Sequence, residues 1–342
     1  MKDIRDYSLL AHNTFGIDAK CRRFLEYSSV EEAQQMVAEL TPDDQPLLIL
    51  GGGSNLLLTG DYKGTVIHSA IKGIKVLDNE KLHSSDSVFL SCGSGEVFDD
   101  VVAYAVEHGY HGAENLSIIP GEVGASAVQN IGAYGVEAKD IIYKVEAVEI
   151  ATGKVVVFDN QDCQYSYRQS RFKHEWKDKY LVTHVIYRLS KHFVPDLDYG
   201  NIRTSLAAKK IGNPTAQQLR DVIIEIRNAK LPDPKVQGNA GSFFMNPIVQ
   251  KAKYEELAAL YPGMPHYTID AEHEKIPAGW MIDQCGWKGQ SLGRAGVHDK
   301  QALVLVNRGG ATGEEIVNLC ETIRKDVKQK FGIDIHPEVN VK

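Results

Sequence analysis

The sequence predicts an α+β protein of two or three domains. At 342 residues the chain is longer than one ordinary hydrophobic core accommodates. Segments with helical periodicity and segments with strand patterns are mixed, without the regular alternation of a doubly wound sheet. Pro232 and Pro234 stop the helical pattern that begins at Thr215, so we expect a domain boundary near this point.

In the N-terminal part, local signals predict two helices and several strands. Ser28 and Glu31 have the spacing of a capping box, and they predict a helix over residues 28–40. A second helix is expected over 96–108, where Gly109 is a plausible C-terminal stop. Apolar runs predict strands over 46–50, 65–68, 88–92, 142–150, 154–158 and 180–189, with a hairpin turn at 151–153.

The C-terminal part continues this mixture. A helix is expected from Thr215, with shorter helices over 253–260 and 278–285 and a strand over 302–307. Thr312 and Glu315 form a second capping-box pattern, which predicts a last helix ending near Phe331 and Gly332. Residues 333–342 are expected to be extended.

The composition excludes several classes of protein. Hydrophobic residues make up 43% of the chain and charged residues 24%, as in globular proteins. The net charge is −7 and the 38 basic residues are scattered, which argues against a nucleic-acid-binding surface. Five cysteines without a CxxC pair or metal-ligand spacing favour a reduced, cytoplasmic compartment. No apolar run approaches the roughly 20 residues of a membrane helix, and residues 1–15 lack a signal-peptide core.

A first glycine-rich motif, Gly51 to Gly53 followed by Ser54 and Asn55, comes directly after a buried strand. Glycines let a backbone approach a ligand closely, and successive N–H groups can then surround a phosphate. The motif is not GxGxxG and no long helix follows it, which argues against a Rossmann site. On this motif alone, a plain turn after the strand is an equally good interpretation.

A second glycine-rich stretch, residues 118–135, carries almost no charge. A solvated loop usually carries more charge, whereas a loop packed against a large ligand needs glycines for clearance and polar groups for hydrogen bonds. Ser126, Gln129 and Asn130 are its candidate donors. A loop packed inside the protein is the lesser alternative.

Ser242 lies in GNAGSFF, residues 238–244, between glycines and two aromatic residues. A serine hydroxyl is a poor acid, and it donates a proton only where cations or a water chain stabilise the alkoxide. From the residues alone, the favoured interpretation is a hydroxyl that bonds its own loop. Arg168 and Glu338 are, on the same basis, compatible with ordinary solvated side chains.

Seven motifs in this order resemble the UDP-N-acetylenolpyruvoylglucosamine reductase family, and the match covers nearly the whole chain. Seven ordered motifs are more specific than any one of them. The motifs occupy residues 13–17, 49–56, 119–121 with 129–135, 167–168, 230–234, 238–244 and 336–338.

The resemblance implies a PCMH-type FAD-binding fold, the vanillyl-alcohol-oxidase type, made of two α/β subdomains, plus a smaller α+β substrate-binding domain. It implies an FAD-binding domain at 17–192, with subdomains at about 1–72 and 73–230. A substrate-binding domain at 231–332 and a tail at 333–342 that returns to the active site would follow. The segment around Tyr267 is present, which indicates the longer, type I form of the family.

The implied reaction is the NADPH-dependent reduction of enolpyruvyl-UDP-N-acetylglucosamine to UDP-N-acetylmuramate through non-covalent FAD, in peptidoglycan synthesis. Arg168 and Glu338 would stabilise an enolate-like species and Ser242 would protonate C2 of the enolpyruvyl group. A guanidinium suits the first task because it grips a carboxylate with two hydrogen bonds. The expected protein is a cytoplasmic monomer with a UDP-sugar substrate, and without a metal, nucleic acid or membrane partner.

The resemblance also implies a set of binding residues. Contacts with FAD would involve Ile49, Gly51, Gly52, Gly53, Ser54, Asn55, Pro120, Gly121, Ala125, Ser126, Gln129, Asn130, Gly132, Ala133, Tyr134, Tyr167 and Arg227. Contacts with the substrate would involve Tyr199, Lys230, Asn246, Tyr267, Lys288 and Gln301, although an ordinary surface or packing role stays open for each of these six.

Three positions depart from the family's pattern. Met245 stands where lysine is usual, Asn340 where some members have arginine, and Ala127 where proline is frequent. They put details of phosphate contact and loop rigidity in doubt. Two other functions stay open: a flavin oxidase that uses molecular oxygen, and a nucleotide-sugar-binding protein without flavin.

Overall fold

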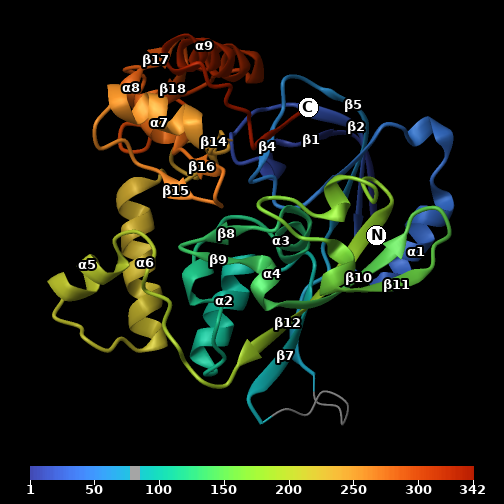
Figure 1. The fold of residues 1–342 in the computed structure, drawn as a ribbon. Helices are drawn as coiled ribbons and strands as arrows, with labels where there is room; N and C mark the ends of the chain where they lie inside the picture. Colours follow the sequence, from blue (N-terminus) through green and yellow to red (C-terminus); the bar gives the residue numbers. More distant parts are fainter. Residues whose placement is uncertain (78–84) are drawn as a thin grey trace. The chain divides into compact units, whose positions relative to one another are not determined.

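The computed structural model describes residues 1–77 and 85–342, which form two compact units. Unit 1 comprises Met1–Tyr7, Cys21–Gly52 and Lys63–Ala229. Unit 2 comprises Ser8–Lys20, Gly53–Tyr62 and Lys230–Lys342. Two short N-terminal segments therefore belong to the same unit as the C-terminal third of the chain, as the colours in Figure 1 allow the reader to follow.

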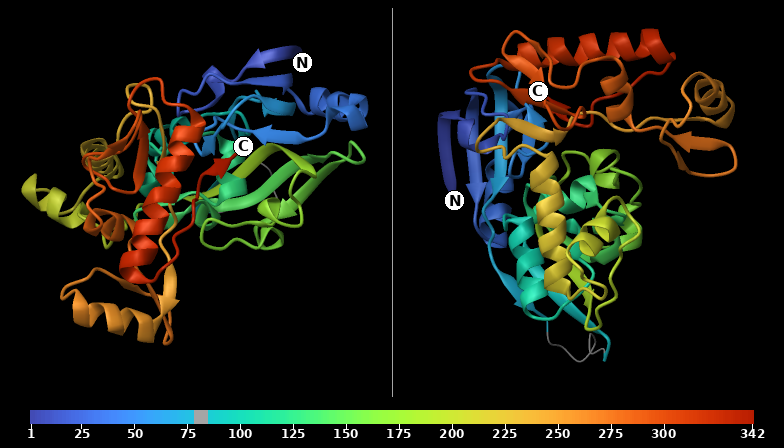
Figure 2. Two further views of the ribbon diagram at one scale, coloured as in Figure 1. Left: turned by 90° about the horizontal axis from the view of Figure 1, so that it is seen from above. Right: turned by 90° about the vertical axis from the view of Figure 1, so that its left-hand side faces the viewer.

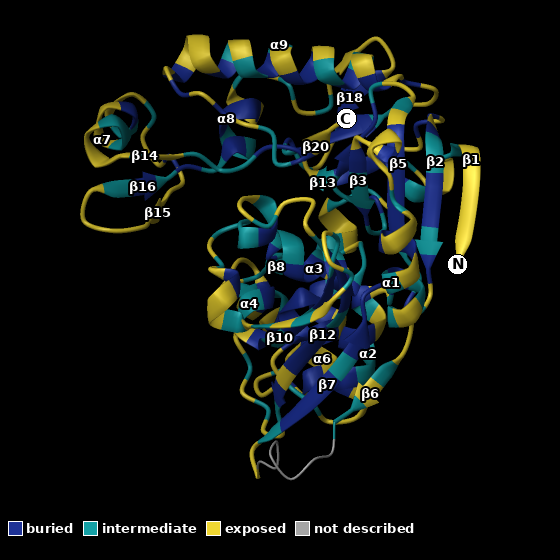
Figure 3. Ribbon diagram, turned by 90° about the vertical axis from the view of Figure 1, so that its right-hand side faces the viewer, coloured by how far each residue is buried: buried dark blue, intermediate teal, exposed yellow. Residues whose placement is uncertain are grey.

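The first sheet of unit 1 has the strand order β1-β2-β5-β3. Leu47 to Leu50 of β3 pair in parallel with Thr65 to His68 of β5. Strand β1 is exposed along most of its length at the sheet edge (Figure 3). The four strands are β1 (Lys2–Ser8), β2 (Lys20–Tyr27), β3 (Leu47–Leu50) and β5 (Tyr62–Ser69).

Helix α1 (Val30–Glu39) packs its apolar side on this sheet. Ala33 and Met36 of the helix share a buried cluster with Tyr27 and Ile67. The N-cap lies one residue later than predicted, because the side chain of Ser29, not Ser28, accepts from the N–H of Glu32.

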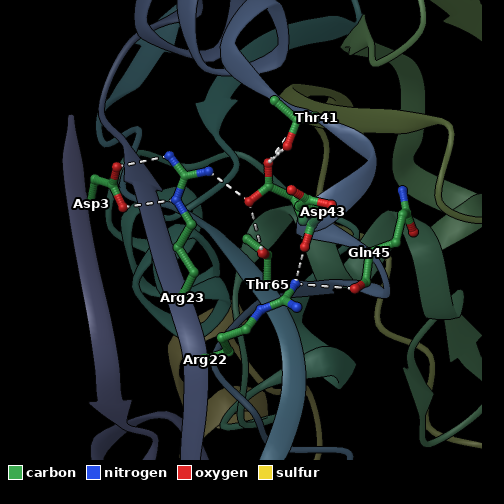
Figure 4. A network of polar contacts seen from close by, with 8 residues as sticks. Asp3, Arg22, Arg23, Thr41, Asp43, Gln45 and Thr65 are labelled. Carbon is green, nitrogen blue, oxygen red and sulfur yellow. Dashed lines mark hydrogen bonds and ion pairs between the residues drawn. The ribbon is translucent and has the colours of Figure 1, made fainter.

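A polar network ties the sheet to the short 3₁₀ helix Pro42–Asp44 (Figure 4). Arg23 on β2 binds both carboxylate oxygens of Asp3 at 2.8 and 2.9 Å, and it binds Asp44 at 2.6 Å. Thr41 and Thr65 also hydrogen-bond to the Asp44 carboxylate. The buried acid thus has partners on every side, which is the condition for a buried charge to be tolerated.

The second sheet of unit 1 is antiparallel, with the order β11-β10-β12-β7-β6. Its strands are β6 (Ile74–Val76), β7 (Ser87–Gly93), β10 (Ile142–Glu149), β11 (Val155–Asp159) and β12 (Tyr180–Ser190). Helices α2 (Phe98–Glu107), α3 (Val123–Gln129) and α4 (Ala138–Ile141) lie beside it in Figure 1 and share its buried core.

Helices α5 (Ile202–Ala208) and α6 (Ala216–Lys230) form a further layer with their own cluster of buried residues, which includes Leu206 and Ile223. Arg220 of α6 forms two hydrogen bonds with Asp99 of α2, at 2.7 and 2.9 Å. This two-pronged pair fixes α6 against α2 within unit 1.

Unit 2 is built on the sheet β13-β19-β18-β17, on which the long helix α9 packs (Figure 1). The elements are β13 (Asn239–Ser242), β17 (Ser291–Leu292), β18 (Ala295–Val297), β19 (Val304–Asn307), α8 (Ala278–Gln284) and α9 (Gly313–Phe331). Thr312 and Glu315 cap α9 reciprocally, and Gly332 ends it with a φ of 70°, so both predicted ends are confirmed.

A second, smaller layer of unit 2 contains the sheet β14-β16-β15 and helix α7, which stand apart from α9 in Figure 2. Its elements are β14 (Ile248–Gln250), α7 (Lys251–Leu260), β15 (Tyr267–Thr268) and β16 (His273–Lys275). The buried carboxylate of Glu274 accepts hydrogen bonds from His266 and Thr268, and the His266 bond lowers its pKa.

The remaining short elements connect these layers. They are the strands β4 (Leu56–Leu57), β8 (Gly132–Ala133), β9 (Val136–Glu137) and β20 (Asn340–Val341), and the 3₁₀ helices Leu10–His12, Glu114–Leu116, Asn160–Cys163 and Arg171–Lys173. The stretch 118–135, which was expected to be a loop, contains α3 and β8, the first strand of the β8–β9 hairpin, so that expectation was wrong.

Within residues 1–77 and 85–342, no helix is both long and apolar enough to span a bilayer. The same residues contain no group of three or more His, Cys, Asp or Glu side chains placed to hold a metal. All five cysteines are free thiols, and four of them are buried.

Candidate active site

In unit 1 the two glycine-rich motifs meet. A Cβ atom on Gly51 would lie 3.1 Å from the Cβ atom of Ala125, and one on Gly52 would lie 3.4 Å from the Cα atom of Gly121. Any larger residue at 51 would crowd the second motif. The end of β3, with Ile49 half-buried, therefore lies against the start of α3, and glycine keeps this meeting point clear of side chains.

The start of α3 is held from outside the helix. The N–H of Gly124 donates to the carbonyl of Ser94 at 2.8 Å, and a Cβ atom on Gly124 would lie 2.9 Å from that serine's Cβ atom. Pro120 is exposed just before the helix. The second motif is thus a short helix that tertiary contacts keep in place.

All three candidate donors of this motif form hydrogen bonds within the protein. The hydroxyl of Ser126, which is 1% exposed, donates to the Val123 carbonyl at 2.6 Å and lies 2.7 Å from the Tyr187 hydroxyl. Asn130 is fully buried with a φ of 49°, and its side-chain amide donates to the Ser166 carbonyl at 2.8 Å. Gln129 accepts a hydrogen bond from the ammonium group of Lys173 at 2.9 Å.

Arg168 is bound to the same motif. Its guanidinium donates to the carbonyl of Gly132 at 2.7 Å, and it lies 5.2 Å from the centre of the Tyr167 ring. Lys173 donates to the Arg168 carbonyl at 2.9 Å. Arg168 has a φ of 57°, a left-handed conformation that is uncommon outside glycine and that these contacts maintain. Sequence reasoning did not single out Lys173.

The hairpin after α3 carries Ala133 and Tyr134, both half-buried. The rings of Tyr134 and the exposed Tyr199 meet edge to face, 6.3 Å apart. Arg227 of α6 has a buried Nε atom without a hydrogen-bond partner among the described residues. Burial lowers the pKa of Arg227.

In unit 2 the first glycine motif continues with Gly53, which has a φ of 64°. A Cβ atom there would lie 1.9 Å from the carbonyl oxygen of His12, so only glycine fits. The N–H of Thr14 donates to the Gly53 carbonyl at 3.2 Å. The motif at 13–17 thus supports the segment that carries Ser54 and Asn55, both half-buried.

The strand that carries Ser242 is built against the same motif. A Cβ atom on Gly238 would lie 2.1 Å from the Phe15 carbonyl oxygen, and the N–H of Asn239 donates to the Thr14 carbonyl at 3.0 Å. Ser242 is exposed at the end of β13, opposite Val304 of β19. Among the described residues its hydroxyl has no hydrogen-bond partner, so the interpretation that it bonds its own loop is not supported.

The C-terminal tail pairs with the residues that follow Ser242. The N–H of Glu338 donates to the Phe243 carbonyl at 2.8 Å, and the N–H of Met245 donates to the His336 carbonyl at 2.9 Å. The side-chain amide of Asn55 donates to the Glu338 carbonyl at 3.3 Å. Unit 2 therefore brings together residues of four predicted motifs: 13–17, residues 53–55 of the motif 49–56, 238–244 and 336–338.

The other predicted substrate residues of unit 2 are dispersed. Asn246 accepts from the N–H of Ala278 at the start of α8. Lys288 lies 3.5 Å from a carboxylate oxygen of Asp283, while Tyr267 is exposed beside Lys275. Gln301 is half-buried and Lys230 is exposed at the end of α6.

The sequence did not predict one group of polar side chains near the glycine motifs. Glu122, His68 and Glu26 form a chain of hydrogen bonds beside Gly51. No sequence signal could have found it, because the three residues lie far apart along the chain and none stands in a recognisable spacing.

Two family models match the chain and define its class. Residues 22–159 match a FAD-binding domain, and residues 233–342 match the C-terminal domain of UDP-N-acetylenolpyruvoylglucosamine reductase. With the glycine motifs that meet in unit 1, the first match identifies a flavoprotein with an α+β FAD-binding fold.

The relatives narrow the class to one family. UDP-N-acetylenolpyruvoylglucosamine reductase of Bacteroides fragilis is 56% identical over 334 residues, which are 98% of each chain, and that of Porphyromonas gingivalis is 47% identical over 338 residues, again 98% of each. The crystal structure of the enzyme from Thermus caldophilus, at 21% identity, matches 99% of this chain and 98% of its own with a TM-score of 0.66. The chain belongs to the UDP-N-acetylenolpyruvoylglucosamine reductase family, and the predicted fold class is confirmed.

Proposed function

We propose that this chain reduces enolpyruvyl-UDP-N-acetylglucosamine to UDP-N-acetylmuramate with NADPH and bound FAD, a step of peptidoglycan synthesis. The relatives that match over 98% of the chain carry the name of this reductase, which supports the reaction. The observation that carries the proposal is the pairing of the tail at 336–338 with residues 243–245, which directly follow Ser242, because it brings the motifs of Ser242 and Glu338 together within unit 2.

We assign the domains as the family resemblance implies. FAD binding falls to residues 17–192, with subdomains at about 1–72 and 73–230, and substrate binding falls to residues 231–332 and the tail at 333–342. The change of unit after Ala229 and the family matches at 22–159 and 233–342 support the boundary near residue 230, although the units place residues 17–20 and 53–62 with the C-terminal part.

The residues of unit 1 fit FAD. The glycine backbone at Gly51 and Gly52 offers N–H groups, and the buried Arg227 Nε atom and one buried oxygen of Glu122 have no hydrogen-bond partner among the described residues, so a bound nucleotide would use these groups. Residues Gly51, Gly52, Gly121 and Ala125 would hold the cofactor in this unit. FAD supplies the hydride-transfer chemistry when bound, and no covalent attachment is expected.

The chain's own groups would handle the substrate's charge and proton. Arg168 would grip the enolpyruvyl carboxylate, and its left-handed backbone with the bond to Gly132 keeps the guanidinium oriented. Glu338 would stabilise the enol form. Ser242 would protonate C2, and its exposed hydroxyl, which has no hydrogen-bond partner among the described residues, supports that role.

The physiological setting is also part of the proposal. We place the enzyme in the cytoplasm as a monomer that acts on a UDP-sugar and binds neither nucleic acid nor membrane. The net charge of −7 and the absence of a membrane-spanning helix among the described residues are consistent with this setting.

An anaerobic half-reaction series tests the function. NADPH should bleach the flavin absorbance of the purified protein, and enolpyruvyl-UDP-N-acetylglucosamine should then restore it. UDP-N-acetylglucosamine, which lacks the vinyl group, is the matched control and should leave the flavin reduced. Recovery with oxygen alone and not with the enolpyruvyl nucleotide would instead indicate an oxidase, and a protein without flavin would indicate a binding protein.

A further inference from the structure

A chain of four charged groups runs through unit 1 to the meeting point of the glycine motifs. Lys2 on β1 lies 2.5 Å from one oxygen of Glu26 on β2. The other oxygen of Glu26 lies 2.9 Å from Nδ1 of His68 on β5, and Nε2 of His68 lies 3.2 Å from Oε1 of Glu122. The charges alternate in sign along this chain.

The contacts of His68 favour its imidazolium form. Both ring nitrogens face carboxyl oxygens, and ionised carboxylates only accept hydrogen bonds, so a ring with protons on both nitrogens satisfies both contacts. Burial by itself lowers the pKa of His68, but the hydrogen bonds with Glu122 and Glu26 outweigh it and the pKa is raised overall. The side chain is 10% exposed and lies beside Phe24, so it has little freedom to turn away.

Only one of the two carboxylate oxygens of Glu122 has a hydrogen-bond partner among the described residues. His68 binds Oε1, whereas Oε2 is buried and has no hydrogen-bond partner among the described residues. A buried acceptor left unsatisfied is costly, and native structures rarely contain one without a ligand or water to meet it. A ligand group that binds beside Oε2 of Glu122 is therefore expected to be a hydrogen-bond donor.

Oε2 of Glu122 lies beside the first glycine motif. Oε2 lies 3.5 Å from the position of a Cβ atom on Gly51, and the Glu122 side chain also lies beside Gly52. A diphosphate offers this oxygen only acceptors and negative charge, so it cannot be the partner. A hydroxyl or an amino or imide N–H of the nucleotide can donate to it.

We propose that Glu122 is a further FAD-binding residue in this chain, whose Oε2 accepts a hydrogen bond from a hydroxyl, amino or imide group of the cofactor, while His68 and Glu26 hold the carboxylate in place. The proposal rests on FAD binding as proposed above. Glu122 contacts the cofactor, and His68 and Glu26 are positioning residues that act through it.

The test is the dissociation constant of FAD, measured by ultrafiltration of diluted holoenzyme, for wild type, Glu122→Gln and Glu122→Ala. A hydrogen bond to a charged group is worth a factor of roughly 10 to 100 in affinity, so Glu122→Ala should weaken binding by about that factor. Glu122→Gln keeps the shape and one acceptor, and it should lose several-fold. If Glu122→Ala does not fold, the FAD affinity of Glu122→Gln still tests the proposal.

Glu114→Gln is the matched control. Glu114 is also a buried carboxylate bound to a histidine, His111, but its second oxygen accepts from the N–H of Gly112, so both oxygens have protein partners. This variant should retain the wild-type FAD affinity. Equal losses in Glu114→Gln and Glu122→Gln would overturn the proposal, because they would indicate a general effect on folding.

Competition by two fragments of FAD shows which half of the cofactor donates the hydrogen bond to Glu122. Competition by riboflavin reports on the ribityl and isoalloxazine half of the cofactor, and competition by ADP reports on the adenosine half. The loss in Glu122→Gln should appear in one of them, and its absence from both would overturn the proposal. A wild-type protein that binds no FAD would overturn this inference and the proposed function together, whereas unchanged affinity in both Glu122 variants would overturn this inference alone.

Discussion

The backbone N–H of Glu338 donates a hydrogen bond to the carbonyl oxygen of Phe243 over 2.8 Å. Phe243 directly follows Ser242, so the tail carries its carboxylate to the backbone position next to the proposed proton donor. The bond uses main-chain atoms only, and the side-chain amide of Asn55 supports it from the other side. The carboxylate of Glu338 can therefore be changed without breaking the pairing that brings it there.

Glu338→Gln should accordingly separate structure from chemistry. The main-chain pairing, the fold and the reduction of flavin by NADPH should persist, while reoxidation by the enolpyruvyl substrate should slow by roughly 10²-fold or more, because the carboxyl group proposed to stabilise the enol form is lost. Stopped-flow absorbance of the flavin measures both steps. Unchanged reoxidation would remove Glu338 from the mechanism.

Gly238→Ala should damage the strand that carries Ser242. The new Cβ atom would lie 2.1 Å from the Phe15 carbonyl oxygen, and neither backbone segment can move without the other. A loss of about 3 kcal/mol in the free energy of unfolding is expected, at the upper end for overpacking. Gly60→Ala, where no heavy atom lies within 4 Å of the added Cβ atom, should change stability by less than about 0.5 kcal/mol in the same urea titration. Similar losses in both variants would contradict this interpretation.

Arg168→Lys should not behave as a conservative change. Lysine keeps the charge but cannot bind the Gly132 carbonyl and a carboxylate with one planar group. Flavin reduction by NADPH should be retained, and single-turnover reoxidation by the enolpyruvyl substrate should fall by roughly 10- to 100-fold, the worth of a hydrogen bond to a charged group. Wild-type turnover in this variant would show that Arg168 has no part in the reaction.

The Arg23–Asp44 pair should make stability depend on acid pH. Burial alone would raise the pKa of Asp44, but the bonds from Thr41 and Arg23 lower it to about 2. Because the unfolded value is about 4, the pair's contribution is fully present above about pH 4 and is lost as the pH falls towards 2. The pKa shift therefore predicts lost stability on the acid side only.

Asp44→Asn provides the measurement. It should lower the free energy of unfolding at pH 7 by about 3 kcal/mol, since one partner of a buried pair is left alone. The difference from wild type should narrow as the pH falls below about 4. Asp43→Asn, at the exposed neighbouring carboxylate, should stay within about 0.5 kcal/mol of wild type. A difference between wild type and Asp44→Asn that does not change with pH would contradict the assignment.

Local signals predicted the elements that local interactions determine. Thr312, Glu315 and Gly332 marked both ends of α9 correctly because a capping box and a left-handed glycine are short-range features. Helix α3 was missed because its seven residues include a glycine and a serine and are too few to show a periodic pattern, and contacts such as that between Gly124 and Ser94 hold it. Strand β1 was missed because its side chains are nearly all exposed and do not alternate.

The candidate site likewise contains segments that the sequence predicted and side-chain contacts that it did not. Ordered motifs identified the segments around Ser242 and Glu338, because their glycines and prolines are recognisable as spaced patterns. The orientation of single side chains was not predictable: the Ser126 hydroxyl bonds inward to Val123, and Glu122 reaches His68 only after β5 and α3 have come together. Long-range polar contacts leave no periodic trace in a sequence.

Ser242→Ala in a stopped-flow instrument tests the central claim most directly, because the serine proton is needed only after hydride has reached the substrate. FAD binding and flavin reduction by NADPH should match wild type, since the change removes one exposed hydroxyl that has no hydrogen-bond partner in the part of the chain that the structure describes. Reoxidation by enolpyruvyl-UDP-N-acetylglucosamine should slow by roughly 10²- to 10⁴-fold, the usual worth of general-acid catalysis. If the variant is reoxidised by the substrate as fast as wild type, Ser242 is not the proton donor.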